Sequence, residues 1–260
     1  MAGNTTNLYA GSAGHYPVGR MPYPPAIGDA LGLEGSERLL DVGCGPGSLT
    51  LVLAPRVRAA VGVDADAGML AEAARQALRA GATNVTWKRL RAEELPADLG
   101  RFELVIFAQS FHWMDHARVA AAVRTMLAPG GRCVLVGATT HRGDASENRL
   151  PHPRPPHEAI AALIGSYVGP AVKGTPWQDD DMRAAGFTGP ERIEVDAGGV
   201  VTRGADEIVA SVFSLSYAAP ERFGAALPRF EADLRALLAA TSPAGAFSER
   251  RRETALDVWR

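Results

Sequence analysis

The sequence predicts an α/β fold, a mostly parallel sheet with helices on both of its faces, from two observations. Along the first 140 residues, short apolar runs alternate with segments of helical periodicity, which is typical of a doubly wound parallel sheet. One of those runs ends in a glycine-rich turn and leads into a helix, over residues 39–54. A turn at the carboxyl end of a strand is a common ligand site in open α/β sheets.

Five strands are expected in the first part of the chain. Before them, Pro24 and Pro25 favour a short helix that reaches Leu31, because proline fits the first helical turn. Apolar and β-branched residues then cluster where strands are expected, at 38–43, 59–65, 84–90, 102–109 and 132–140. Helices are expected between strands at 45–56, 70–80 and 119–127, where a proline or a glycine ends each helical pattern.

The regular alternation ends at residue 141, where a polar, proline-rich stretch begins. Apolar spacing in the rest of the chain predicts a helix at 158–168, a short helix at 179–186, a sixth strand or a hairpin at 191–203, two helices within 206–238 and an edge strand at 254–260.

Composition excludes several classes of protein. The net charge of −2 excludes a strongly basic nucleic-acid binder, and the two cysteines, Cys44 and Cys133, exclude a disulfide scaffold and a multi-cysteine zinc site. The histidines at 141, 152 and 157 are too loosely spaced to indicate a metal site. No secretory signal and no apolar run of the ~18 residues that a membrane span needs is present, so we expect a cytoplasmic protein without a metal.

The glycine turn and two acids indicate a nucleoside ligand. Asp41 lies in the first strand, and Gly43, Gly45 and Gly47 follow it; glycine permits positive φ angles and lets a ligand approach the backbone closely. Asp64 follows Gly43 by 21 positions (64 − 43), at the tip of the second strand. An acid in that position suits the two hydroxyls of a ribose.

Nicotinamide dinucleotides fit the turn less well than other adenosine ligands. Their fingerprint is G-x-G-x-x-G, but here the third glycine comes one residue early and Ser48 takes the expected place. Asp41 is also an unusual acid beside a pyrophosphate and suits an amine-bearing ligand better. No Gly-Lys-Ser/Thr follows the turn, which excludes a Walker phosphate loop.

Asp41–Gly47 (DVGCGPG), followed by Asp64 in VGVDAD, resembles the first two motifs of the class I S-adenosylmethionine-dependent methyltransferases. RAEELP (91–96) is similar to the third motif of that family. FAQSFHWMD (107–115) and YPVGRMPYP (16–24) resemble a small-molecule subgroup that includes trans-aconitate methyltransferase-like enzymes, although Met21 replaces the usual proline. The resemblance covers residues 16–140.

The resemblance implies a Rossmann-like, seven-stranded sheet with its last strand antiparallel, a helical cap, and methyl transfer from S-adenosyl-L-methionine, with S-adenosyl-L-homocysteine as the product. Its implied domains are an arm at 1–24, a cofactor-binding core at 25–140, a cap insertion at 141–180, core strand six at 181–203, a helical cap at 204–247 and the last core strand at 248–260. The acceptor is expected to be a small molecule rather than a nucleic acid or a membrane.

The family's functional residues map onto this chain position by position. The implied cofactor-binding residues are Arg20, Asp41, Gly43, Gly45, Gly47, Asp64, Ala65, Met69, Ala92, Glu93 and Gln109. Tyr16, Tyr23, His112 and Trp113 are the expected acceptor pocket. His112 follows strand four, where it acts either as a general base or as a packed pocket residue.

Two other functions stay open at this point. One is a nicotinamide-dependent oxidoreductase on a similar sheet. The other is a repurposed protein that binds S-adenosylmethionine without transferring its methyl group.

Overall fold

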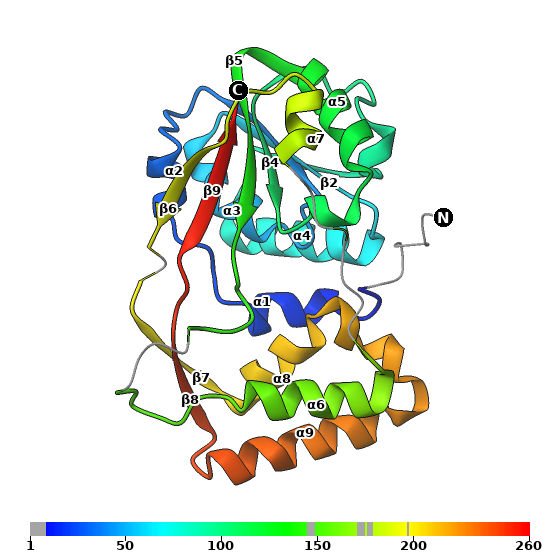
Figure 1. The fold of residues 1–260 in the computed structure, drawn as a ribbon, viewed down its shortest axis with the longest axis vertical. Helices are drawn as coiled ribbons and strands as arrows, with labels where there is room; N and C mark the ends of the chain where they lie inside the picture. Colours follow the sequence, from blue (N-terminus) through cyan, green and yellow to red (C-terminus); the bar gives the residue numbers. More distant parts are fainter. Residues whose placement is uncertain (1–8, 145–148, 171–174, 176–178, 197) are drawn as a thin grey trace. The chain divides into compact units, whose positions relative to one another are not determined.

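The computed structural model describes residues 9–144, 149–170, 175, 179–196 and 198–260. The chain forms two compact units (Figure 1). The sheet unit comprises Tyr23–Ala138, Gly174–Asp196 and Glu253–Arg260, and the helical unit comprises the segments that remain. These divisions differ from the domain boundaries expected from the sequence, which stay a prediction.

The sheet unit contains a seven-stranded sheet of order β3-β2-β1-β4-β5-β9-β6. Its strands are β1 (Arg38–Val42), β2 (Ala59–Asp64), β3 (Val85–Arg89), β4 (Phe102–Ala108), β5 (Leu127–Gly137), β6 (Glu191–Val195) and β9 (Thr254–Trp259). The first five run parallel, and β9 is antiparallel to both of its neighbours. The predicted mostly parallel, seven-stranded sheet is therefore confirmed.

Successive residues of the central strands supply two separate apolar cores, one on each face. Leu40 and Val105 pack with the helices α5 (His116–Met126) and α7 (Asp179–Ala184). Their neighbours Leu39 and Ile106 pack with α2 (Ala26–Ala30) and α3 (Ser48–Leu53) on the other face. A strand buried on both faces requires this alternation of side chains, so the helices cover both sides of the sheet.

The remaining elements of the sheet unit are short, with one exception. The exception is the helix α4 (Ala67–Ala80). The Asp66 carboxylate caps its first turn, and the helix ends at Gly81. The 3-10 turns are η3 (Ala54–Arg56), η4 (Ala92–Glu94) and η5 (Phe111–Trp113). Two of these turns, η4 and η5, carry predicted site residues.

Two sequence predictions of individual elements are wrong, and of the two alternatives at 191–203 the structure shows the strand. The helix expected from residue 45 begins at Ser48, because the glycines before it adopt positive φ angles. The last strand is not an edge strand: β9 pairs with β5 and β6, and Leu256 and Trp259 are fully buried. Residues 191–203 do not form a hairpin, because β6 joins the large sheet while β7 (Val200–Gly204) pairs with β8 (Ala246–Arg250).

The helical unit is built around an aromatic cluster. Its helices are α1 (Tyr16–Gly19), α6 (His157–Val168), α8 (Ala205–Phe213) and α9 (Leu227–Thr241), with the 3-10 turns η2 (Ala13–His15), η6 (Ser216–Ala218) and η7 (Pro220–Ala226). Phe223 stacks on Phe230 with ring centroids 4.1 Å apart, and Phe213 meets both rings edge-on. The helices α6 and α9 lie side by side (Figure 1). No helix of the described residues is long and apolar enough to cross a membrane.

Gly19 lets α1 lie against the backbone of α8. A Cβ atom at Gly19 would lie 2.2 Å from the Ser211 nitrogen and 2.3 Å from the Ala210 carbonyl carbon. We therefore expect Gly19→Ala to lower the free energy of unfolding by about 1–3 kcal/mol or more, the cost of overpacking. Urea unfolding of the full chain measures this change.

Gly14→Ala is the matched control, because Gly14 is also near α1 and a Cβ there meets nothing within 4 Å. Equal stability of the two variants would contradict the close packing of α1 on α8.

Candidate functional site

The glycine turn lies at the carboxyl ends of the parallel strands, between β1 and α3. The amides of Gly43 and Cys44 both donate to the Val63 carbonyl of β2, at 2.8 and 3.0 Å. Gly43, Gly45 and Gly47 have φ angles of 70°, 54° and 78°, a region that side-chain-bearing residues rarely adopt. The chain can therefore turn from strand to helix over these few residues while staying attached to β2.

The three glycines differ in what surrounds them. A Cβ at Gly43 would lie 2.6 Å from Cβ of Ser110, and one at Gly47 would lie 2.6 Å from the Trp87 ring. A Cβ at Gly45 meets nothing within 4 Å. Gly45 is therefore the point of the turn that a ligand can approach closely.

Asp64 connects the glycine turn to the tip of β2. One carboxylate oxygen, Oδ2, accepts the Gly45 amide at 2.8 Å, and the other, Oδ1, accepts the Asp66 amide at 2.9 Å. Burial raises the pKa of Asp64, although these amides act in the opposite direction. A carboxylate has about four lone-pair sites, so each oxygen keeps one for a ligand hydroxyl.

Asp41 is fully buried within β1. Its Oδ2 accepts the Thr50 hydroxyl at 2.5 Å, and its Oδ1 has no hydrogen-bond partner among the residues that the structure describes. Burial raises the pKa of Asp41 from 3.8 to about 7, against the effect of the Thr50 bond, and the Asp64 charge adds to the increase. The turn thus has a buried acid beneath it with one unsatisfied oxygen.

The residues expected around an adenine lie on two elements. Met69 of α4 and Ala92 of η4 are buried, whereas Ala65 is partly exposed after β2. Glu93 accepts the Asp115 amide at 3.1 Å and lies 3.6 Å from the Arg91 guanidinium. These contacts explain the position of the Glu93 carboxylate without a ligand.

The segment after β4 contains the remaining polar groups of this edge. Gln109 adopts a φ of 56° and donates its side-chain amide to the Val136 carbonyl at 3.1 Å. Ser110 is buried against Gly43 and donates to the Val42 carbonyl at 2.5 Å. A positive φ at a residue with a side chain is uncommon and often marks a functional site.

His112 and Trp113 belong to η5, with their rings 4.8 Å apart. Burial lowers the pKa of His112, and the nearby His116 lowers it further. The imidazole is therefore neutral at pH 7 and able to accept a proton. It has no hydrogen-bond partner within the described part of the chain, so no second group orients it.

The other predicted residues have different surroundings. Tyr23 is buried in the apolar core beside α2 and α3, and its place in an acceptor pocket stays a prediction. In the helical unit, Arg20 lies over the Tyr16 ring and donates through Nε to Ser214 at 2.7 Å. The predicted contacts of Arg20 and Tyr16 with cofactor and acceptor stay predictions.

Thr50 and Ser110 are site residues that the sequence analysis missed. Thr50 lies nine positions after Asp41 (50 − 41), in the helix after the turn, and Ser110 directly follows Gln109. The one sequence signal available was that Thr50 is a polar residue in the helix that follows the turn. The contacts of Thr50 and Ser110 themselves depend on how strands and helices pack.

No cluster of three metal-binding side chains occurs among the residues that the structure describes. Cys44 lies inside the turn, where burial raises the pKa of its thiol, so the thiol stays protonated and unreactive.

The pKa of Asp41 predicts a pH-dependent stability. Above about pH 4 the unfolded chain releases the proton that the folded chain keeps until about pH 7. The wild type should therefore lose stability relative to Asp41→Asn as pH rises between those values, by up to about 4 kcal/mol. Urea unfolding at about pH 4, 6 and 8 measures the difference.

Asp180→Asn is the control, because the side chain of Asp180 is 90% exposed. Parallel stability curves for the wild type and Asp41→Asn would show that Asp41 is ionised in the folded chain.

Comparison with known proteins agrees with this geometry. Residues 39–131 match the model of a family described as a methyltransferase domain. An uncharacterized methyltransferase of Mycobacterium tuberculosis is 40% identical over 134 residues, which are 51% of this chain and 53% of that protein. The chain thus spans about half the length of the curated relatives it matches.

Solved structures share the fold. A methyltransferase from Geobacter sulfurreducens, in complex with S-adenosyl-L-homocysteine, covers 98% of this chain and 97% of its own, with a TM-score of 0.54 and 15% identity. The cyclase SpnF covers 91% of this chain and 80% of its own, with a TM-score of 0.53 and 20% identity.

The matched segment includes the glycine turn, Asp64 and the strand β4, which Gln109 follows. The sheet order and the turn are those of the class I fold, and residues 39–131 are similar to a methyltransferase domain.

Proposed function

We propose that this protein transfers a methyl group from S-adenosylmethionine to a small-molecule acceptor. The observation that carries the proposal is the pair formed by Gly45 and Asp64. The turn is open to a ligand at Gly45. The Asp64 carboxylate, which accepts the Gly45 amide, keeps free lone pairs at the tip of β2. A ribose with two hydroxyls fits such a carboxylate.

The chain's own residues supply the rest of the cofactor site. Met69 and Ala92 offer apolar surface for an adenine. The unsatisfied Oδ1 of Asp41 favours a ligand with a hydrogen-bond donor, such as an amine. Bound S-adenosylmethionine supplies a methyl group that its positive sulfur makes reactive.

The protein's main contribution to catalysis would be alignment of donor and acceptor. Proximity of this kind lowers a barrier by roughly 7–11 kcal/mol. His112 is neutral at pH 7 and would accept a proton from an acceptor that must lose one. The segments 16–24 and 107–115 favour the trans-aconitate methyltransferase-like subgroup, and the net charge of −2 favours a small molecule over a nucleic acid.

A protein that uses this fold without methyl transfer is the second candidate. The cyclase SpnF, a protein of different named activity, has a similar fold, and a fold alone does not define chemistry. The nicotinamide-dependent alternative is not favoured, because the family match is to methyltransferases.

Binding of the reaction product tests the cofactor site. S-adenosyl-L-homocysteine should bind the wild type saturably by isothermal titration calorimetry, and NADH should not. Asp64→Ala should weaken binding by about 1.5–3 kcal/mol for each ligand hydroxyl lost, or about 10- to 100-fold, because hydrogen bonds to a charged group are strong.

Asp180→Ala, which removes an exposed carboxylate of the same unit, should leave the affinity unchanged. Wild-type affinity in Asp64→Ala would disprove the ribose assignment. Binding of NADH alone would support the oxidoreductase.

Turnover separates the two roles of His112. If His112 is a general base, His112→Ala should lower kcat by about 10²-fold or more and leave S-adenosyl-L-homocysteine affinity near that of the wild type. The wild-type pH–rate profile should fall below the lowered pKa of His112, and the variant should lose this acid limb.

His152→Ala replaces a histidine outside the predicted site and should behave as the wild type. A parallel loss of affinity and kcat in His112→Ala would assign His112 to packing instead.

A further inference from the structure

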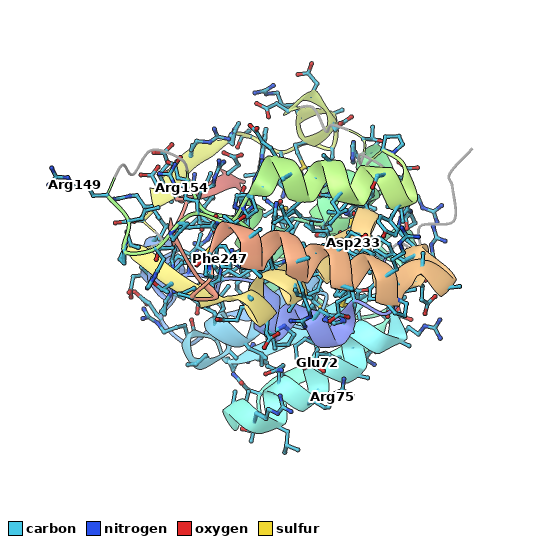
Figure 2. All side chains as sticks on the ribbon, turned by 90° about the horizontal axis from the view of Figure 1, so that it is seen from below. Glu72, Arg75, Arg149, Arg154, Asp233 and Phe247 are labelled. Atoms are coloured by element: carbon cyan, nitrogen blue, oxygen red, sulfur yellow. The ribbon has the colours of Figure 1, made fainter. Side chains whose placement is uncertain are left out.

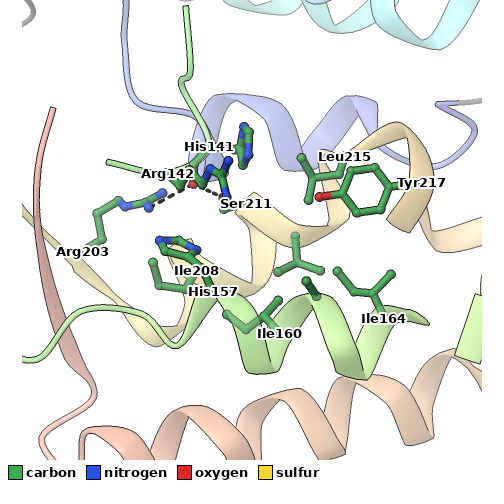
Figure 3. Close-up of a pocket in the computed structure, with 12 residues that line it drawn as sticks. His141, Arg142, His157, Ile160, Ile164, Arg203, Ile208, Ser211, Leu215 and Tyr217 are labelled. Atoms are coloured by element: carbon green, nitrogen blue, oxygen red, sulfur yellow. Dashed lines mark hydrogen bonds between the residues drawn. The ribbon is translucent and has the colours of Figure 1, made fainter. Parts of the chain in front are cut away.

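The helical unit contains a pocket of its own that the proposed methyl transfer does not use. It has a volume of about 440 Å³, including space open to solvent, and all its lining residues belong to the helical unit. Figure 3 shows that polar side chains gather at one end and apolar side chains at the other.

The polar end is organised by Arg203, whose side chain is only 5% exposed. Its guanidinium donates to the Glu249 carboxylate at 2.5 Å and to the carbonyls of His141 and Gly19 at 3.2 and 3.1 Å. His157 contacts the other Glu249 oxygen at 2.6 Å. The Nε atom of Arg203 is buried and has no partner in the described part of the chain, so one strong donor of the pocket wall is unsatisfied there.

The charges at this end do not cancel. Arg203 and Glu249 neutralise each other, but Arg142 is exposed and has no ion-pair partner within the described ranges. Among the described residues, those that line the pocket include no acid. Burial, together with the positive charges of Arg20, Arg142, His157 and Arg203, lowers the pKa of His141 to about 3. The polar end therefore has a positive electrostatic potential.

The apolar end is formed by α6, α8 and the segment that follows α8. Ile160 and Ile164 come from α6, Val212 comes from α8, and Leu215 follows α8. The Tyr217 ring closes this end (Figure 3). An apolar ligand group placed here would gain about 25 cal/mol for each Å² removed from water.

The Glu249 contacts by themselves have a structural explanation. Gly143 also donates to Glu249, at 2.8 Å, so the carboxylate attaches the start of the 141–157 stretch to β8. That role explains Arg203 and His157. It explains neither the unpaired Arg142 nor the open space between a positive end and an apolar end.

We propose that this pocket binds a small organic monoanion, a carboxylate with a short apolar tail, whose charged group lies beside Arg142 and Arg203 and whose tail lies between Ile164 and Leu215. A single negative charge matches Arg142, which has no ion-pair partner within the described ranges. Binding at this pocket does not depend on the proposed function.

Hexanoate is the probe, and it is titrated into the full-length protein without S-adenosyl-L-homocysteine. Hexanol has the same tail with no charge, and hexylamine has the same tail with the opposite charge. We expect saturable hexanoate binding, at least tenfold tighter than that of either comparison compound, by isothermal titration calorimetry or ligand-observed NMR.

Two pairs of variants locate the probe. Ala161 and Ala162 are neighbouring exposed residues of α6, but only Ala161 lines the pocket. Ala161→Phe should weaken hexanoate binding at least tenfold by filling the entrance, and Ala162→Phe should not.

Arg142→Gln should remove the preference for hexanoate over hexanol. Arg149→Gln, at an exposed position that points away from the unit (Figure 2), should keep it.

Thermal melting of each variant checks that the fold is intact. The proposal fails if wild-type protein shows no saturable hexanoate binding, or if folded Ala161→Phe binds as the wild type does. Equal losses in Arg142→Gln and Arg149→Gln would also overturn it, because they would show general attraction to positive charge. None of these outcomes affects the test of the cofactor site.

Discussion

The hydrogen bond from the Gly45 amide to the Asp64 carboxylate is the interaction on which the candidate site depends. It joins the turn after β1 to the tip of β2 at 2.8 Å, next to the two amides that bind the Val63 carbonyl. Since the parallel pairing of β1 and β2 brings Val42 opposite Val63, the turn and the acid meet at one edge of the sheet. Positive φ angles at the glycines make this connection possible.

The two units use buried carboxyl groups in opposite ways. Burial would raise the pKa of Glu249, but hydrogen bonds from His157, Gly143 and Arg203 outweigh it and lower the pKa to about 2. Asp41 accepts from Thr50, and burial raises its pKa to about 7. A buried carboxylate whose oxygens have hydrogen-bond partners stabilises the fold, whereas a buried acid with an unpaired oxygen is a feature of functional sites.

Strain accumulates at the same edge of the sheet. Gln109 has a positive φ directly after β4, and Ser110 packs within 2.6 Å of where a Gly43 side chain would begin. Such a conformation costs about 1–3 kcal/mol and persists where the surroundings impose it. Here the Val136 and Val42 carbonyls hold Gln109 and Ser110. The edge is thus preorganised around the turn, as alignment of two reactants requires.

The sequence by itself determined the sheet strands, the glycine turn and the acid at the tip of β2, because local apolar patterns and spacing along one chain encode them. Tertiary structure alone decided that β9 lies between β5 and β6, that β7 pairs with β8 in a separate sheet, and that Tyr23 lies in the core. It also decided the bond of Thr50 to Asp41 and the pocket between α6 and α8. Each of these joins residues far apart in the sequence or on different elements, and such pairing depends on packing that no local pattern records.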